Sequence, residues 1–154
     1  MNKEKIIKII LAISAIILVA VLGSIFVNLG MEWYEALKTP SQWIAGYIIP
    51  IVWTAVYLSF GIILFLWIKN EEIPKNVVIL LIINGILNIL WCLTFFTLQQ
   101  LLLGNIIIVI NALLAIKLVF EISKTNKVYS LILSIYPTWV CIAKTFNLAL
   151  WILN

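Results

Sequence analysis

Five long apolar runs, separated by short polar turns, constrain this chain more than any other feature of its sequence. A helix needs about 20 apolar residues to cross the hydrocarbon core of a bilayer. The runs are continuous rather than alternating, which favours helices over the strands of a membrane β-barrel. The sequence therefore predicts an all-α integral membrane bundle of five transmembrane helices, at about residues 6–29, 44–68, 77–98, 101–122 and 128–152.

Composition agrees with lipid as the solvent. Hydrophobic residues make up 65% of the chain and charged residues 10%, whereas soluble domains average about 45–50% and about 25%. The first run is too long for a signal peptide, whose apolar region spans about 7–15 residues. We therefore expect one membrane domain over residues 1–154, with a single long loop at about residues 30–43.

The lysines predict the orientation of the bundle. Five spans place the two termini on opposite faces of the membrane. The long loop on one face carries only Lys38, and the turns on the other carry Lys3, Lys5, Lys8, Lys69, Lys75, Lys124 and Lys127. By the positive-inside rule, the N-terminus is expected in the cytoplasm and the C-terminus outside.

Most catalytic and metal chemistry is excluded by residue types. The chain has no Asp, Arg or His, so it has neither a Ser-His-Asp triad nor a His-based zinc site. Cys92 and Cys141 lie inside apolar runs and are interpreted as small buried apolar groups. Glu32 and Glu35 are interpreted as a solvated loop pair. No metal and no required cofactor are expected. No nucleic-acid partner is expected either, because the excess of Lys in a membrane protein is first a signal of topology.

Two helical stripes could line a binding site. Trp53, Tyr57 and Gly61 recur at spacings of four, which places them on one face of the second span. That face is either a packing seam or one wall of a site for a flat ligand. Ala143 and Asn147 follow Trp139 in the same way in the fifth span, where Ala143 leaves space between two polar-tipped groups.

Polar groups inside the spans have two interpretations each. The amides of Asn88 and Asn147 need partners in lipid, so each is either a helix–helix contact or a ligand contact. Lys144 would cost about 2.5–3.5 kcal/mol in lipid. On a helix of 100° per residue it lies about 140° from Trp139 and borders the stripe of Asn147. It either extends to the interface or pairs with a carboxylate of a bound ligand.

The Trp residues divide by depth. Four lie near span ends, where an interfacial belt or a loop cap is favoured: Trp33, Trp43, Trp67 and Trp151. Three lie deeper, where packing and a ligand pocket are both open: Trp53, Trp91 and Trp139.

The order of these aromatic and Asn residues resembles the translocator protein family, also called TspO/MBR or tryptophan-rich sensory proteins. The five short-looped spans with one long first loop resemble that family's layout as well. The residues that carry the resemblance are Trp33, Tyr34, Leu37, Pro40, Ser41, Pro50, Trp53, Tyr57, Gly61, Asn88, Trp91, Phe95, Phe96, Tyr136, Trp139, Ala143, Asn147 and Trp151. The C-terminal cholesterol motif of animal members is absent here.

The resemblance implies a bacterial cell-membrane protein, a homodimer surrounded by membrane lipid. Its expected ligands are protoporphyrin or haem, or another flat hydrophobic molecule such as a sterol or a synthetic aromatic. With Lys144 added from its position, the expected ligand-binding residues are Trp33, Tyr34, Pro40, Trp53, Tyr57, Asn88, Trp91, Trp139, Ala143, Lys144 and Asn147. Light-dependent porphyrin breakdown stays open, with Trp53 and Trp139 as the candidate reactive groups. The alternative function is a transporter, although five spans do not divide into two equal repeats.

Overall fold

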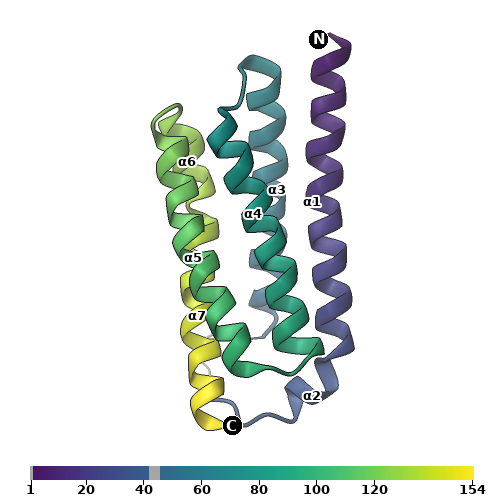
Figure 1. Ribbon diagram of the computed structural model, residues 1–154, viewed down its shortest axis with the longest axis vertical. Helices are drawn as coiled ribbons and strands as arrows, with labels where there is room; N and C mark the ends of the chain where they lie inside the picture. The colour runs from purple at the N-terminus through teal and green to yellow at the C-terminus, as the bar shows by residue number, and fades with distance from the viewer. Residues whose placement is uncertain (1, 42–45) are drawn as a thin grey trace.

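The structure is a computed structural model that describes residues 2–41 and 46–154. These residues form helices and no strand. Five segments are long and apolar enough to span a membrane, which confirms the predicted all-α five-span bundle (Figure 1). The spans are α1 (Lys3–Leu29), α3 (Ile48–Asn70), α4 (Lys75–Cys92) extended by η1 (Leu93–Thr97), α5 (Leu101–Ser123), and α6 (Lys127–Leu133) followed by α7 (Ile135–Leu153).

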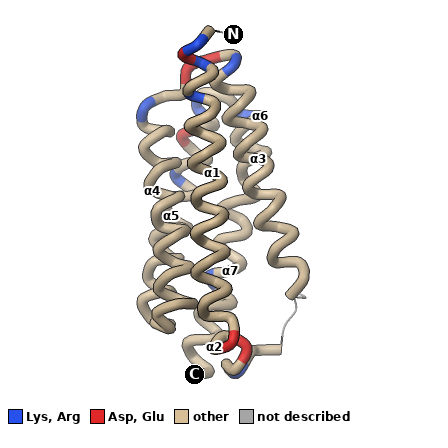
Figure 2. The backbone as a smooth tube through the Cα atoms, turned by 90° about the vertical axis from the view of Figure 1, so that its right-hand side faces the viewer, with Lys and Arg blue, Asp and Glu red and all other residues tan. Residues whose placement is uncertain are grey.

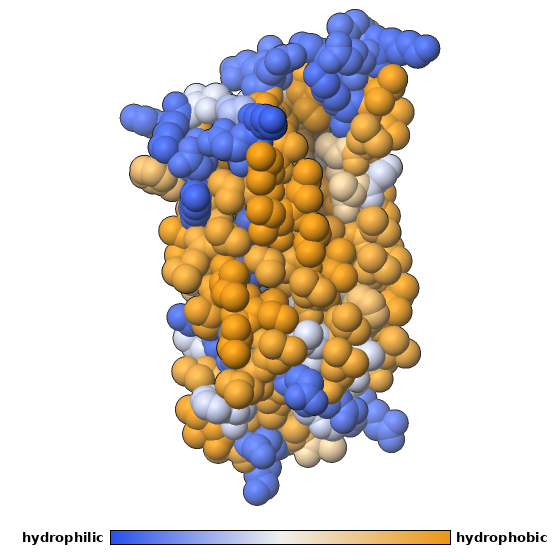
Figure 3. Space-filling view, in the orientation of Figure 1, coloured by the Kyte–Doolittle hydropathy of each residue, from blue (hydrophilic) through white to orange (hydrophobic). Residues whose placement is uncertain are grey.

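The spans pack as a ring. Helix α1 contacts α3 and α4, α4 contacts α5, and α5 contacts both α6 and α7. Helix α3 closes the ring against α6 and α7. Large apolar side chains such as Ile17, Leu58, Ile82 and Leu113 are exposed. Figure 3 shows a broad apolar band on the face in view, with hydrophilic residues gathered at its two ends. A band of this kind suits contact with lipid tails.

The two ends of the bundle differ in charge. One end, here called the basic end, carries the N-terminus and the turns around residues 71–74 and 124–126; Figure 2 shows most Lys and Glu there. Lys8 pairs with Glu4 at 2.6 Å, and the Lys5 ammonium donates to the Lys69 carbonyl at 2.8 Å. The opposite end, here called the lid end, carries the C-terminus and the short helix α2 (Met31–Glu35).

The fifth span is not the single helix predicted over 128–152. It breaks at Ser134, between α6 and α7. Pro137 explains the break, because proline has no N–H to donate to the Leu133 carbonyl and its ring clashes there. Pro137 instead occupies the first turn of α7, and the next N–H, that of Thr138, donates to the Ser134 carbonyl at 3.2 Å.

The segment predicted as a loop at 30–43 contains α2, which packs tightly against the end of the third span. A Cβ on Gly30 would overlap the Phe96 carbonyl, so only glycine allows this approach. The Thr97 hydroxyl donates to the Phe26 carbonyl at 2.8 Å, which joins η1 to α1. The second span was predicted to begin at residue 44, but residues 42–45, including Trp43, lie outside the described residues; α3 begins at Ile48.

Helix η1 is a π-helical turn, in which the Leu98 N–H donates to the Leu93 carbonyl at 2.9 Å. The wider turn lets two successive side chains, Phe95 and Phe96, both be buried. The absence of a Cβ on Gly104 of α5 makes room for the Phe95 ring. This local geometry directs Phe95 into the core and brings Phe96 to the cavity described next.

Candidate ligand-binding site

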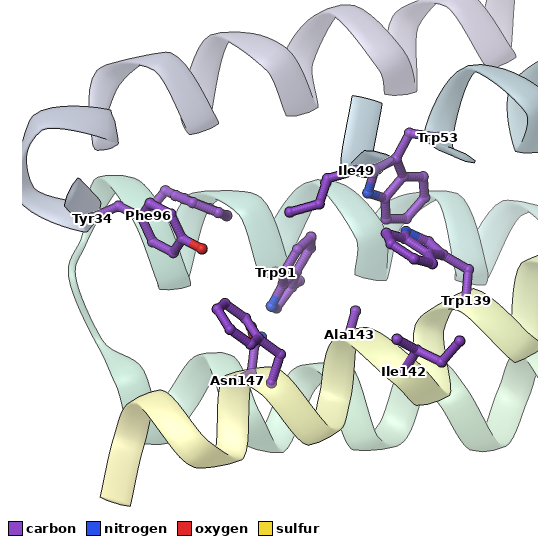
Figure 4. Close-up of a pocket in the computed structure, with 10 residues that line it drawn as sticks. Tyr34, Ile49, Trp53, Trp91, Phe96, Trp139, Ile142, Ala143 and Asn147 are labelled. Atoms are coloured by element: carbon purple, nitrogen blue, oxygen red, sulfur yellow. The ribbon is translucent and has the colours of Figure 1, made fainter. Parts of the chain in front are cut away.

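A cavity of about 80 Å³ lies toward the lid end, enclosed by α2, α3, the third span and α7 (Figure 4). Its lining residues are mainly aromatic and apolar: Tyr34, Ile49, Trp53, Trp91, Phe96, Trp139, Ile142, Ala143, Phe146 and Asn147. Mostly apolar walls with a few polar groups are typical of small-molecule sites.

One wall of the cavity is built from stacked rings. The ring centroids of Trp53 and Trp91 lie 6.4 Å apart with an interplanar angle of 27°. Tyr57 stacks behind Trp53 at 5.7 Å and 26°. Offset stacking of this kind fixes the ring orientation, so the cavity has a preformed aromatic face.

Three buried N–H donors, on residues that line the cavity, have no hydrogen-bond partner. They are the Nε1 atoms of Trp91 and Trp139 and the Nδ2 atom of Asn147. The three residues are only 8%, 7% and 4% exposed, respectively. An unpartnered buried donor costs about 1–3 kcal/mol, and such groups are infrequent in native proteins. The cavity therefore combines apolar walls with unused donors.

Asn105 fixes α7 at the level of the cavity. Its Nδ2 donates to the Asn147 backbone carbonyl at 3.1 Å and to the Leu101 carbonyl at 2.9 Å. Because Asn105 is buried on α5, this contact crosses between helices where lipid and water are both excluded. Asn105 is thus a positioning residue that the predicted site did not include. The sequence feature that could have identified it is a polar amide inside an apolar run, because such a group needs a hydrogen-bond partner in lipid.

The lid end of the cavity is closed by α2 and the residues after it. The Tyr34 ring packs against Phe96 with centroids 5.3 Å apart, and burial raises the pKa of the Tyr34 hydroxyl, which keeps its proton at neutral pH. Further along, the Asn154 side chain clamps Lys38. The Lys38 N–H donates to Asn154 Oδ1 at 2.9 Å, and Asn154 Nδ2 donates to the Lys38 carbonyl at 3.0 Å.

Six of the eleven predicted site residues line the cavity together. They come from four helices, α2, α3, α4 and α7: Tyr34, Trp53, Trp91, Trp139, Ala143 and Asn147. This convergence joins the two stripes predicted from the second and fifth spans. It also places Trp53 and Trp139, the candidate reactive groups, on the same cavity.

The other five predicted residues lie beside the cavity rather than on its wall. Trp33 packs edge-on against Phe95 with centroids 6.2 Å apart. Tyr57 supports Trp53 from behind, and Asn88 is buried with its Oδ1 facing Cys92 Sγ at 3.9 Å. Pro40 and Lys144 are both half-buried and are not among the lining residues.

Four lining residues were missed by the sequence analysis. Ile142 and Phe146 lie one residue before Ala143 and Asn147, so a wider helical stripe would have included them. Ile49 lies in the first turn of α3, just after the residues that the structure does not describe. Phe96 depends on the π-helical turn, for which the apolar pattern gives no signal.

Comparisons with known proteins agree with this architecture. The TspO/MBR family profile matches residues 12–152. The chain is 30% identical to Tryptophan-rich protein TspO of Archaeoglobus fulgidus, over 97% of this chain and 98% of that protein. It is 32% identical to Tryptophan-rich protein TspO of Chlorobaculum tepidum, over 100% and 99%. Protein CrtK of Rhodobacter capsulatus is 25% identical over 79% of this chain and 78% of its own length. This five-span membrane protein therefore belongs to the TspO/MBR family.

Proposed function

We propose that the protein binds a flat hydrophobic ligand, of the tetrapyrrole class, in the cavity beneath α2. The observation that carries the proposal is that the stacked indoles of Trp53 and Trp91 line one cavity together with two residues that carry unpartnered donors, Trp139 and Asn147. Stacked indoles present a large flat apolar face, and the donors provide orientation. Family membership supports the proposal.

A tetrapyrrole needs more room than the cavity provides. The volume of about 80 Å³ is below the 300–1,000 Å³ of ordinary ligand sites. The side where α3 faces α7 is the natural place to open, because α7 packs chiefly on α5 and α3 also contacts α6. Binding therefore includes displacement of α2, which covers the cavity as a lid, and separation of α3 from α7 at the lid end.

A fluorescence titration tests the proposal. Protoporphyrin added to the purified protein in detergent should quench Trp emission in a saturable way. Trp53→Leu and Trp139→Leu should each weaken binding by about tenfold, since an aromatic contact is worth on the order of 1 kcal/mol. Trp151→Leu, on the exposed outer face of α7, is the matched control. Equal affinity in all four proteins would contradict the proposed site.

Light-dependent breakdown is a second candidate activity, because Trp53 and Trp139 both line the cavity. An indole next to a bound photosensitiser is within reach of oxidation. The test compares loss of protoporphyrin absorbance in light and in darkness for the parent and for Trp53→Phe with Trp139→Phe combined. Equal loss in both proteins under light would leave binding as the function.

We also propose that the basic end faces the cytoplasm, as the lysine distribution in Figure 2 favours. Single cysteines at Lys38 and Asn126, in a background with Cys92→Ser and Cys141→Ser, test this orientation. A membrane-impermeant thiol reagent applied to intact cells should label position 38 and spare position 126. The reverse pattern would invert the orientation.

A further inference from the structure

We propose that this cavity selects ligands by a hydrogen-bond acceptor, a carbonyl or carboxylate oxygen at the edge of a flat apolar body. The proposal rests on the proposed function and adds the chemistry of the ligand's polar group. It follows from the polar side-chain groups of the residues that line the cavity, which are predominantly donors.

The donors outnumber the acceptors whatever the rotation of the Asn147 amide. Trp91 and Trp139 each contribute an indole N–H, a group that donates and never accepts. The Asn147 amide contributes two N–H bonds and one oxygen, and turning it exchanges their positions without changing their number. Even if its oxygen accepted from a neighbouring indole, N–H groups would remain without partners.

Acceptors near the cavity are scarce or already engaged. The Asn147 backbone carbonyl accepts from Asn105 Nδ2 at 3.1 Å. The Tyr34 hydroxyl both donates and accepts, and no charged side chain is among the lining residues of the described chain. A ligand that offers an N–H would find few partners, whereas a ligand that offers an oxygen would find several.

Unpartnered atoms elsewhere in the protein do not share this setting. Trp67 Nε1 and Asn84 Oδ1 also lack partners, but neither residue lines the cavity. In Figure 4 the indole nitrogen of Trp91 points toward α7 near Asn147, while Trp139 lies at the other end of the cavity beside Trp53. The geometry thus favours an acceptor near Trp91 and Asn147, with the flat body extending toward Trp53.

Three tricyclic probes of nearly the same shape test the inference. Fluorene has no strong polar group, 9-fluorenone carries a carbonyl oxygen, and carbazole carries an N–H. Each probe is titrated against the full-length protein in detergent, with partition into empty micelles subtracted. We expect 9-fluorenone to bind about tenfold more tightly than either analogue, as one well-formed hydrogen bond allows. We also expect the infrared carbonyl stretch of bound 9-fluorenone to fall below its value in an apolar solvent.

Variants then locate the donors. Asn147→Leu and Trp91→Phe remove N–H groups and keep apolar walls, so each should reduce the preference for 9-fluorenone over fluorene by at least threefold. Asn84→Leu removes a buried amide from α4 outside the cavity and should leave the preference unchanged. If a variant fails to fold, the infrared shift in the parent decides the question.

The outcomes separate this inference from the function on which it rests. Equal affinities for the three probes in the parent, or an unshifted carbonyl band, would overturn acceptor selection while leaving a flat-ligand site intact. Failure of fluorene and the other probes to bind at all, together with failure of protoporphyrin, would overturn the proposed function and this inference with it. A retained preference in both donor variants would remove these residues as its cause.

Discussion

The basic end and the lid end of the bundle are built from similar apolar residues but differ in packing, because one has a filled core and the other contains a cavity. At the basic end, α6 lies against both α3 and α5, and Trp67, Leu118, Ile122 and Leu133 are fully buried. At the lid end, the walls formed by α3 and α7 leave a cavity between them. Within the fifth span, the break at Ser134 lies between the part in the filled core and the part that lines the cavity. The break near Pro137 thus divides the fifth span into the short α6, which packs against α3 and α5, and the longer α7, which packs on α5 and also lines the cavity.

Each end of the bundle combines satisfied polar groups with an unpartnered donor. At the basic end, Asn76 donates to Glu121 at 2.8 Å and the Ser130 hydroxyl donates to the Val119 carbonyl at 3.0 Å. At the lid end, Trp91 Nε1 and Asn147 Nδ2 have no partner, and at the basic end Trp67 Nε1 has none either. Since well-filled cores contribute most to stability, we expect substitutions in the core of the basic end to destabilise the fold more than substitutions at the cavity wall.

The largest expected effect tests this division through stability. Leu133→Ala should lower the free energy of unfolding by about 2–5 kcal/mol, because it opens a void in a filled core. Ile142→Ala removes a side chain of similar volume that already faces the cavity, and should cost less than about 1 kcal/mol. Denaturant unfolding in mixed micelles, followed by Trp emission, measures both. Equal losses would show that the two ends are packed alike.

The next effect is on binding rather than stability. Ala143→Phe fills the cavity between Trp139 and Asn147, and should weaken protoporphyrin binding by at least about tenfold. Ala55→Phe places the same ring on the exposed surface of α3 and serves as the control. Titration of Trp emission compares them. Parent-like affinity in Ala143→Phe would remove Ala143 from the site.

A smaller effect concerns the clamp between Asn154 and Lys38. Asn154→Leu removes two hydrogen bonds that hold the residues after α2, each worth about 0.5–1.5 kcal/mol. Ligand dissociation, followed by stopped-flow fluorescence, should become about fivefold faster because the lid opens more readily. Asn76→Leu breaks a hydrogen bond at the basic end and should leave the rate unchanged. An unaltered rate in Asn154→Leu would show that the lid is held elsewhere.

Much of the fold was predictable from sequence because lipid imposes a simple rule. Continuous apolar runs predict helices, and the predicted ends of the third and fourth spans lie within two residues of the observed ones. The break in the fifth span was not predicted, although Pro137 was visible. Proline is tolerated inside membrane helices, so its presence alone does not determine whether a helix kinks or restarts.

The site was predictable where helical periodicity determines it. The spacings of Trp139, Ala143 and Asn147 place them on one wall, as observed. Tyr57 shares a stripe with Trp53 but stacks behind it and does not line the cavity. Helical periodicity predicts which face of a helix a residue lies on, but not how far it is from the cavity. Phe96 and Asn105 depend on contacts between spans distant in sequence, which a single sequence does not specify.

The smallest expected effect is at Lys144. Its side chain is half-buried on α7 and absent from the cavity lining, and its ammonium pairs with none of the carboxylates in the described chain. Nine residues separate it from Leu153 at the end of α7, a rise of roughly 14 Å. The flexible stem shortens that distance to the membrane surface, so extension to the interface explains the charge better than a ligand contact.

Comparison of protoporphyrin with its dimethyl ester decides the point for Lys144. If the ammonium only anchors α7 at the interface, Lys144→Met should change the ratio of the two affinities by less than about twofold, a difference below 0.5 kcal/mol. An ion pair with a ligand carboxylate would instead make the parent favour the free acid, and the variant would lose that preference. Lys117→Met, which removes an exposed lysine from α5, controls for the change in net charge. A loss of preference confined to Lys144→Met would show that the binding site includes Lys144, outside the cavity wall. The site would then recognise the charge of the ligand as well as its shape.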